Sequence, residues 1–357
     1  MCSIGVECKA DVSVIIPVFN AENWIQECLK SIEAQNSTLI IEVSIFNDSS
    51  TDNSSRLIKQ WIQSVSDKSN MKVVYSEHSN GCPKGCGFAK NKAVLQSSAP
   101  YLCFQDSDDV MTANRIEVLY KTAMKFDINR NLLIGSRFHR IPEDSTKRFT
   151  EWANNLTQAQ LYTNIYTSHG PSLIMPTWFC SRNVFNRING FDESGKGAAE
   201  DLIFFYKHLD CGGELMKVDE DLLLYRYHLQ QTTFSVSEQT IWNLRLERFQ
   251  RVVLSEWNTF CIWNAGKEGK RLYRSLSPEN RQKVVSFCDV DAKKIRKGFY
   301  TFEESSERVK PRVPIVHFTE AQPPFVICVK LGLTKGMFES NLRSLCLTDG
   351  IDYFHFG

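Results

Sequence analysis

Three carboxylates follow a short apolar run, and they are the residues best suited to chemistry in this chain. Tyr101–Phe104 has the composition of a buried strand, and Asp106, Asp108 and Asp109 come directly after it. In open α/β sheets, ligands bind at the carboxyl ends of the strands. Hard divalent cations prefer oxygen ligands and often join carboxylates to a substrate's phosphates. The pattern predicts metal-assisted handling of a nucleoside diphosphate compound, and a solvated acidic turn is the alternative.

Other polar segments also follow apolar runs or open helical patterns. They are Pro17-Val18-Phe19-Asn20-Ala21-Glu22, Asp48-Ser49-Ser50-Thr51-Asp52, Gly85-Cys86-Gly87-Phe88-Ala89-Lys90-Asn91, Glu200-Asp201 and Tyr225-Arg226-Tyr227-His228. An Asp at a helix start is often only a cap, and a lone His is more often structural than a ligand. Functional roles for Asp201 and His228 are therefore supported only by the presence of the other motifs in the same chain.

Strands and helices must alternate to bring these motifs together. Apolar runs predict strands at 11–18, 40–46, 72–75 and 101–104, and helical spacing of apolar residues predicts helices at 22–34, 53–65 and 88–95. The middle of the chain is less regular, with strands predicted at 132–135, 172–180 and 220–227 and a helix at 200–209. This alternation predicts an α/β protein with a mostly parallel sheet flanked by helices.

The pattern restarts near residue 256. A strand at 260–263 leads through Gly266 and Gly269 into a helix at 270–276, and a strand at 284–288 ends on Asp289. That order matches a Rossmann-like βαβ unit, in which the acid would meet a ribose hydroxyl. Because only two glycines are present, we favour a degenerate scaffold that binds no dinucleotide. We predict a catalytic domain at 1–240 and a smaller Rossmann-like α/β domain at 241–357.

The charge of the chain is uneven. The 357 residues have a net charge of +1, but residues 241–357 contain 19 Lys/Arg against 13 Asp/Glu. Within that C-terminal segment, Lys293, Lys294, Arg296 and Lys297 form a compact cationic cluster. Such a cluster is compatible with a polyanionic partner, and a solvated basic face explains it equally well.

Several features concern the compartment. The twelve cysteines show no pairing rhythm, which favours a reducing environment. The first residues lack a basic region followed by an apolar core, so no signal peptide is expected, and no apolar stretch approaches membrane-spanning length. We expect a cytoplasmic protein with no membrane partner.

The four N-terminal motifs resemble those of glycosyltransferase family 2, whose members have the GT-A fold. The family's usual forms are P-x-Y-N-x-E, D-D-G-S-T-D, G-x-x-x-A-R-N and D-x-D-D, in this order and at about these spacings. The chain departs from them by having Phe19 for Tyr, Asn47 for Asp, Ser49 for Gly and Lys90 for Arg. The resemblance covers residues 12 to about 235.

The resemblance implies a role for each matching residue. It implies donor binding by Pro17, Phe19, Asn20, Glu22, Asp48, Lys90, Asn91 and Asp106, metal binding by Asp108 and His228, and catalysis by Asp201 with Glu200 as its neighbour. Mn²⁺ or Mg²⁺ would be the cofactor. An Asp carboxylate can accept the N3–H of uracil and an aromatic ring can stack on it, which suits a UDP-sugar donor.

The whole chain, including its C-terminal part, is similar to the animal glycosyltransferases that modify queuosine in tRNA. That similarity implies UDP-galactose as donor and the cyclopentenediol of queuosine, at the wobble position of cytosolic tRNA-Tyr, as acceptor. Contacts to RNA are expected from the cluster at 293–297. Trp178 or Tyr166 could stack on a splayed anticodon base, although such residues more often belong to the core.

Three alternatives stay open. One is another UDP-sugar transferred to a protein, lipid or glycan, and another is a non-catalytic nucleotide-sugar or RNA-binding protein. The third is a dinucleotide-dependent activity of the C-terminal part. Intact Asp48, Asp106, Asp108 and Asp201 argue against loss of activity.

Overall fold

A computed structural model describes residues 9–78, 81–168 and 170–357. The N-terminal segment on which the expectation of no signal peptide depends lies outside the described residues. The chain forms two compact units, one built from residues up to 158 together with 170–240, and the other from 159–169 together with 241–357.

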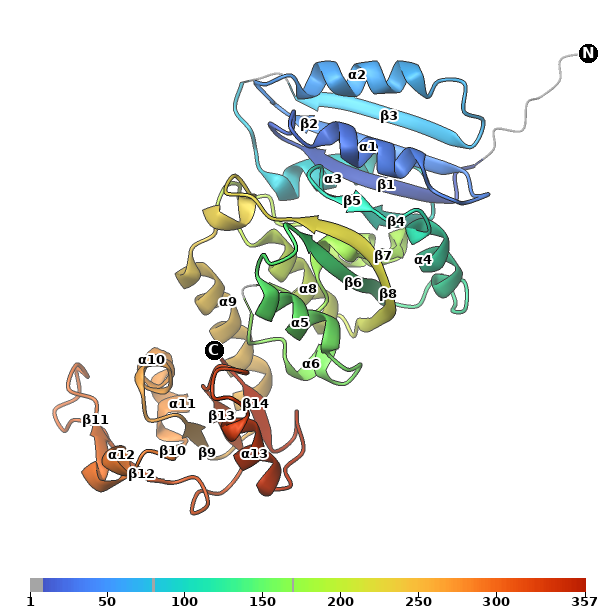
Figure 1. Cartoon of the computed structure of the whole chain (residues 1–357). Coiled ribbons are helices and arrows are strands. Elements are labelled where there is room, and N and C mark those ends of the chain that lie inside the picture. Colours follow the sequence, from blue (N-terminus) through green and yellow to red (C-terminus); the bar gives the residue numbers. More distant parts are fainter. Residues whose placement is uncertain (1–8, 79–80, 169) are drawn as a thin grey trace, which may run out of the picture. The chain divides into compact units, whose positions relative to one another are not determined.

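The first unit is built on one mixed sheet (Figure 1). Its described strands are β1 Val12–Val18, β2 Ile41–Asp48, β3 Met71–His78, β4 Tyr101–Phe104, β5 Val110–Met111, β6 Leu132–Ile141, β7 Phe179–Ser181 and β8 Glu214–Arg226. They lie in the order β3-β2-β1-β4-β7-β6-β8-β5. The strands β3, β2, β1 and β4 are parallel, β7 is antiparallel to both its neighbours, and β8 runs parallel to β6.

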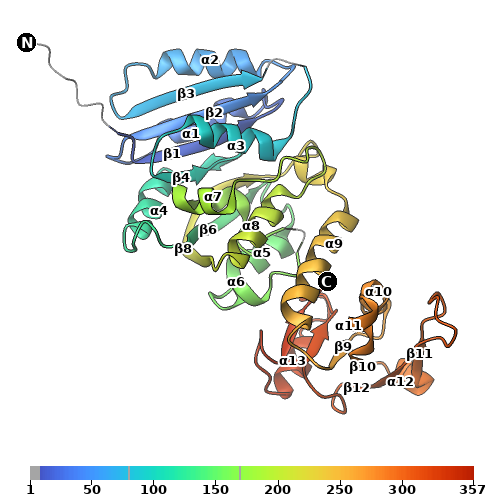
Figure 2. The same ribbon diagram turned by 180° about the vertical axis from the view of Figure 1, so that it is seen from behind.

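Helices cover both faces of this sheet (Figures 1 and 2). They are α1 Ile25–Glu33, α2 Ser54–Ser64, α3 Cys86–Gln96, α4 Arg115–Ala123, α5 Lys147–Asn155, α7 Arg182–Ile188 and α8 Glu200–Asp210, with 3₁₀ helices η1 Met175–Thr177 and η2 Thr232–Ser235. Every residue of β1 and β2 is buried, as expected for strands covered on both sides. Apolar residues of α1, α2 and α4 join one face of these strands in a single core. On the other face, the Ser44 hydroxyl donates to the Ala93 carbonyl of α3.

The prediction of a strand at 172–180 is wrong for most of its length. Residues 175–177 form η1, and only Phe179–Ser181 pair as β7. Pro176 has no N–H and cannot donate to a strand ladder, so the apolar composition of this segment serves burial rather than strand pairing. The segment is fully enclosed, with Thr177 and Trp178 inaccessible to solvent.

The second unit is a smaller α/β layer. Its described elements are α6 Gln160–Thr163, α9 Glu238–Phe249, π-helix η3 Gln250–Leu254, β9 Phe260–Trp263, α10 Lys267–Ser275, α11 Pro278–Gln282, β10 Val284–Asp289, α12 Ala292–Lys297, β11 Phe299–Thr301, β12 Arg312–His317, β13 Phe325–Ile327, α13 Met337–Ser344 and β14 Tyr353–His355. The strand order is β11-β12-β10-β9-β13-β14, parallel except for the β11–β12 pair. A Cβ at Gly269 would lie 1.9 Å from the Asn264 carbonyl, so glycine permits the close approach of α10 to the turn before it.

The α/β fold class predicted from the sequence is confirmed. Within the described part of the chain, no helix combines the length and the apolar character needed to cross a bilayer. Cysteines in both units are free thiols, and many of them, including Cys28 and Cys103, are buried in the cores.

Candidate active site

The ends of three parallel strands bring the polar motifs to one edge of the first sheet. Val18 pairs with Asn47 in the register of β1 and β2, and Ile15 pairs with Phe104 in that of β1 and β4. The segments that follow these strands therefore emerge side by side. Such an edge is the usual ligand-binding side of an open α/β sheet.

Two of the predicted donor-binding residues tie neighbouring loops together. The Asn20 Oδ1 atom accepts the Thr51 N–H at 2.8 Å, and the Glu22 Oε2 atom accepts the Asn53 N–H at 3.0 Å. Pro17 is buried inside β1, so it shapes the strand end instead of offering a surface to a ligand. Phe19 is 48% exposed, which leaves its ring available for stacking. Phe19 and Asn20 are the exposed residues of this motif, and Phe19 alone of the two offers an aromatic face.

Asp48 ends β2 with its carboxylate almost completely buried. Its Oδ2 atom accepts the N–H groups of Lys84 and Gly85 at 2.7 and 2.8 Å. Its Oδ1 atom has no hydrogen-bond partner among the described residues and lies 3.7 Å from Nδ1 of His78. A buried acceptor without a donor is costly unless a ligand supplies one. The arrangement suits a ligand N–H such as N3–H of uracil.

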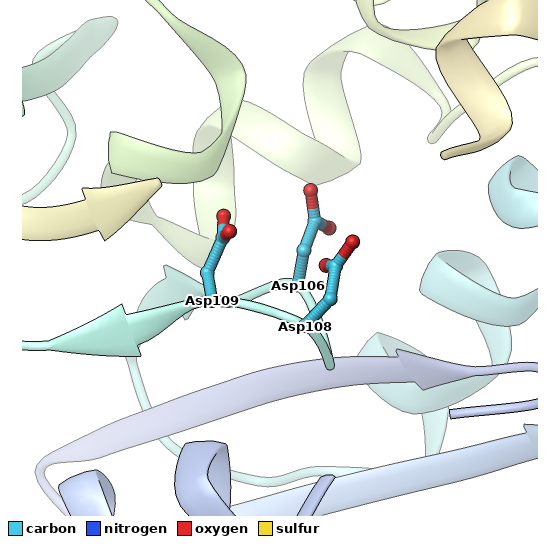
Figure 3. Close-up of side chains that lie close together, drawn as sticks. All are labelled: Asp106, Asp108 and Asp109. Atoms are coloured by element: carbon cyan, nitrogen blue, oxygen red, sulfur yellow. The ribbon is translucent and has the colours of Figure 1, made fainter. Parts of the chain in front are cut away.

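The three carboxylates after β4 form a cluster whose side chains rise from one turn (Figure 3). Each of Asp106, Asp108 and Asp109 offers an oxygen, and these atoms lie within 4.8 Å of one another. Burial raises the pKa of Asp106 to about 6, with Asp108 adding to the rise and Lys90 opposing it. The pKa of Asp109 lies well above its ordinary value because of burial and of the charges on Asp108 and Asp106. A divalent cation would relieve this repulsion, and the all-oxygen donor set fits Mg²⁺ or Mn²⁺.

The structure brings the predicted metal ligands Asp108 and His228 together. The Nε2 atom of His228 lies 2.8 Å from Oδ2 of Asp108, and its ring stacks on Trp24 with centroids 4.8 Å apart. The Nδ1 atom of His228 accepts the Gln230 N–H at 3.2 Å, which favours the tautomer with the proton on Nε2. A metal at this position would take the place of that proton.

Asp109 was predicted only as one of three carboxylates suited to a metal, and Arg226 was given no role, although both lie inside recognised motifs. The Arg226 N–H donates to Asp109 Oδ1 at 2.8 Å, and its Nε donates to the Asp108 carbonyl at 2.8 Å. Its guanidinium also bonds to Glu27 and lies over the Trp24 ring. Arg226 thus joins the end of β8 to the acidic turn. The sequence signals for these two roles were the three acids within residues 106–109 and the later Tyr-Arg-x-His motif.

Asp201 lies at the start of α8, where it was predicted to act as a base. Its Oδ1 atom accepts the Leu202 N–H at 2.7 Å. Burial and the charge on Glu200 raise the pKa of Asp201 to about 7, and the positive charge of Lys90 acts in the opposite direction. Asp106 also raises the pKa of Asp201, so the two acids share one electrostatic environment. A carboxylate with a pKa near 7 suits a general base at neutral pH.

Lys90 and Asn91 require a correction, because neither presents its side chain as a donor ligand. Lys90 is 2% exposed and its Nζ donates to Glu200 Oε1 at 3.0 Å. The Asn91 amide donates to the Phe191 carbonyl at 3.0 Å and accepts the Phe191 N–H at 2.8 Å, so it fastens the loop before α8. Gly87 permits this packing, since a Cβ there would lie 2.0 Å from the Asp192 carbonyl.

Of the two interpretations considered for Trp178 and Tyr166, stacking on a base and packing in the core, the structure supports the core. Trp178 is completely buried and its Nε1 donates to the Leu173 carbonyl at 2.8 Å, while Tyr166 is 1% exposed. Both rings are core residues and cannot stack on a base. Trp178 packs instead against aromatic rings of α8.

The predicted cationic cluster lies on α12 of the second unit. Lys293, Arg296 and Lys297 are exposed, whereas Lys294 donates to Asp289 Oδ2 at 2.8 Å. The carboxylate of Asp289 also accepts the N–H groups of Ala265, Val290 and Asp291. Asp289 is therefore occupied by its own chain at the position where a ribose hydroxyl was considered.

Comparisons with known proteins agree with this geometry. The profile of the glycosyl transferase family 2 matches residues 13–188. The glycosyltransferase GlyG of Streptococcus pneumoniae is 22% identical over 238 residues, covering 63% of this chain and 75% of GlyG. Glycosyltransferase GlyA of the same organism is 33% identical over 115 residues, which are 32% of this chain and only 15% of GlyA. The uncharacterized glycosyltransferase EpsJ of Bacillus subtilis is 23% identical, with 73% of this chain and 74% of EpsJ covered.

A solved structure shares the fold. The S. aureus protein TarS 1-349, crystallised with UDP-GlcNAc, superimposes with a TM-score of 0.54 at 17% identity, covering 75% of this chain and 71% of TarS 1-349. The GT-A fold predicted from the motifs is thereby confirmed. The residues that match the profile of glycosyl transferase family 2 all lie between 13 and 188, and the first unit holds the corresponding motifs at one edge of the sheet.

Proposed function

We propose that this chain, with its family 2 glycosyltransferase domain, moves a hexose from a UDP-sugar to an acceptor hydroxyl with inversion at the anomeric carbon. The observation that carries this proposal is the pairing of two kinds of acid. A cluster of three carboxylates ends β4, and a separate carboxyl, Asp201, has a pKa raised to about 7. The first kind suits a diphosphate with its counter-ion, and the second suits proton removal from an acceptor.

Uridine as the donor base is supported by Asp48 and Phe19. The free Oδ1 of Asp48 can accept N3–H of uracil, and the half-exposed Phe19 ring can stack on the base. TarS 1-349, which shares the fold, was crystallised with UDP-GlcNAc. Phe19 supplies no hydroxyl, so in this proposal the base is held by stacking and by the Asp48 carboxylate.

Asp106, Asp108 and Asp109, with His228, would hold Mn²⁺ or Mg²⁺. When bound, such an ion neutralises negative charge on the diphosphate leaving group. Arg226 orients this set through its bonds to Asp109 and to the Asp108 carbonyl.

The transfer step needs one base. An acceptor hydroxyl gives its proton to the Asp201 carboxylate as its oxygen forms a bond to the anomeric carbon. The bond from that carbon to the diphosphate oxygen breaks, and the electron pair leaves with UDP. Attack opposite the leaving group inverts the anomeric configuration. Glu200 supports Asp201 as its charged neighbour at the start of α8.

For the finer identity, we propose UDP-galactose as donor and the cyclopentenediol of queuosine at the wobble position of tRNA-Tyr as acceptor. This rests on the sequence resemblance of the whole chain. The exposed cations of α12 provide a surface of the right charge for RNA phosphates. Free thiols throughout both units support a reducing, cytoplasmic compartment.

Incubation with tRNA from queuosine-replete and queuosine-free cells, offering each UDP-sugar in turn, tests the proposal. Mass spectrometry of the anticodon nucleoside should show one added hexose only with queuosine-containing tRNA and UDP-galactose. Transfer of another sugar, or transfer only to a glycan, lipid or protein, would refute the finer identity and leave the transferase in place. UDP-sugar binding without turnover on any acceptor would refute the enzyme.

The contribution of α12 can be measured separately through salt. The Lys293→Ala/Arg296→Ala/Lys297→Ala variant should bind tRNA more weakly and reduce the slope of log Kd against log salt by about two to three. A matched control removes three exposed cations of the first unit, Lys30, Lys125 and Lys207. Equal slopes for the two triple variants would exclude α12 as the phosphate contact.

A further inference from the structure

One cation, Lys90, lies among the acids of the candidate active site and is itself buried. It belongs to α3, and its ammonium donates to Glu200 Oε1 at 3.0 Å and to the Met175 sulfur at 3.4 Å. The ring of Phe191 lies 5.2 Å from the same nitrogen. The side chains of Lys90 and Glu200 are 3% and 14% exposed. The Lys90–Glu200 pair is thus largely withdrawn from water. Charge interactions are stronger in such a buried environment than in water.

The position of Lys90 links the acids at the strand ends with the acids of α8. Its charge acts on Asp106, on Glu200 and on Asp201. Around Asp201, the charged groups from the packed elements are Glu200 of α8, Lys90 of α3 and Asp106 of the turn after β4, together with the Leu202 N–H. Lys90 is the group among these whose full positive charge favours the ionised carboxylate.

We propose that Lys90 is a positioning residue that holds Glu200 and keeps the Asp201 carboxylate ionised, rather than a ligand of the donor. This inference rests on the proposed function, because it assigns the acid-base behaviour of the same site. A buried ion pair is costly to break from one side, since the remaining charge is left unpaired. Removal of Lys90 leaves three acids without their shared counter-ion, and the ionised form of Asp201 becomes harder to reach.

Opposite substitutions should move the pH profile in opposite directions. With Lys90→Met, the pH midpoint of kcat should rise by about one pH unit, since loss of a nearby opposite charge changes the pKa of a carboxyl by about 1–3. At pH 7 that corresponds to roughly a fivefold loss of kcat, regained above about pH 9. With Glu200→Gln, the midpoint should fall because the neighbouring negative charge is lost. Lys90→Arg should have the same pH midpoint as wild type, since arginine keeps the positive charge.

A matched control is available on the same helix. Lys92 is exposed two residues further along α3, so Lys92→Met removes an equal charge without touching the site. It should leave both the midpoint and kcat unchanged. A purely structural role for Lys90 would lower kcat at every pH in all its variants and leave the midpoint where it is, and that outcome would overturn the inference.

A second readout does not require turnover. The carboxyl ¹³C resonance of Asp201, assigned by comparison with Asp201→Asn, can be titrated by NMR in wild type and in Lys90→Met. A higher midpoint in Lys90→Met supports the inference, and an equal midpoint refutes it. If wild type transfers no sugar while the resonance still moves as expected, the proposed function fails and the counter-ion role stands.

Discussion

Exchange of the Asp48 carboxylate for an amide should reverse the base preference of the donor site. In Asp48→Asn, the side-chain oxygen must face the N–H groups of Lys84 and Gly85, because both donate to Oδ2 at 2.7 and 2.8 Å. The new NH₂ group then occupies the place of Oδ1. That atom has no partner among the described residues and is the acceptor proposed for uracil. An NH₂ group facing the N3–H of uracil places two donors against each other.

The magnitude follows from the loss of one hydrogen bond to a charged group. Such a bond contributes about 1.5–3 kcal/mol, so the Kd for UDP should increase about 10- to 150-fold. Cytosine carries an acceptor at N3 in place of the N–H, and the amide can donate to it. The affinity for CDP should therefore increase relative to the affinity for UDP. The loop at 84–85 should keep its hydrogen bonds, and the stability of the fold should not change.

Isothermal titration calorimetry with UDP and CDP at saturating Mn²⁺, for wild type and Asp48→Asn, measures both affinities. Thermal unfolding of the variant checks that the loop and fold are intact. Asp67→Asn, an exposed charge in the same unit, is the control for net charge. An unchanged ratio of UDP to CDP affinity in Asp48→Asn would refute the assignment of Asp48 to the base.

Three further predictions concern the base, the metal and the scaffold. Asp201→Asn should lower kcat by at least about 100-fold while UDP still binds. The wild-type rate should rise with pH through about 7, because only the ionised carboxylate accepts a proton. Turnover that survives the substitution would contradict the assignment of Asp201 as the base. A chelator should abolish transfer until Mn²⁺ or Mg²⁺ is restored. Asp108→Ala should raise the metal concentration needed for half-maximal transfer by about 10- to 100-fold. Activity that resists the chelator would refute the metal site. Arg115 is fully buried and donates to the Gln105 side chain and to the carbonyls of Phe104 and Pro176, so Arg115→Met should lower the free energy of unfolding by about 3 kcal/mol or more. Urea unfolding measures this loss. For the exposed control Arg56→Ala, the free energy of unfolding should fall by less than about 0.5 kcal/mol, and equal losses in Arg115→Met and Arg56→Ala would contradict the structural role of Arg115.

The regular part of the fold could be predicted because its signals are local. The strands at 101–104 and 260–263 have the bounds predicted from the sequence, and the helix at 200–209 differs by one residue. Continuous apolar runs and helical spacing describe how a segment buries itself, which depends on its own residues. The segment at 172–180 was mispredicted because its apolar composition reflects burial on all sides, and composition does not state which backbone groups pair.

Sequence alone determined the kinds of residue available at the site. Acids after β2 and β4, an acid pair opening α8 and a histidine after β8 are properties of the motifs, and their order along a parallel sheet places them at one edge. Tertiary structure decided what each residue does there. Lys90 and Asn91 adjoin in sequence, yet one pairs with Glu200 and the other holds the Phe191 backbone. Trp178 could have been an exposed platform, and its surroundings made it core.

The same division holds for charge. A sequence gives each carboxyl its ordinary pKa, but burial and the charges that folding brings near it set the value in the folded chain. Asp201 reaches a pKa of about 7 because folding removes it from water and places its charge near those of Glu200 and Asp106, while Lys90 opposes the rise. Backbone conformation is governed by nearest neighbours in the chain, whereas electrostatic energy depends on distance through space and on exclusion of solvent.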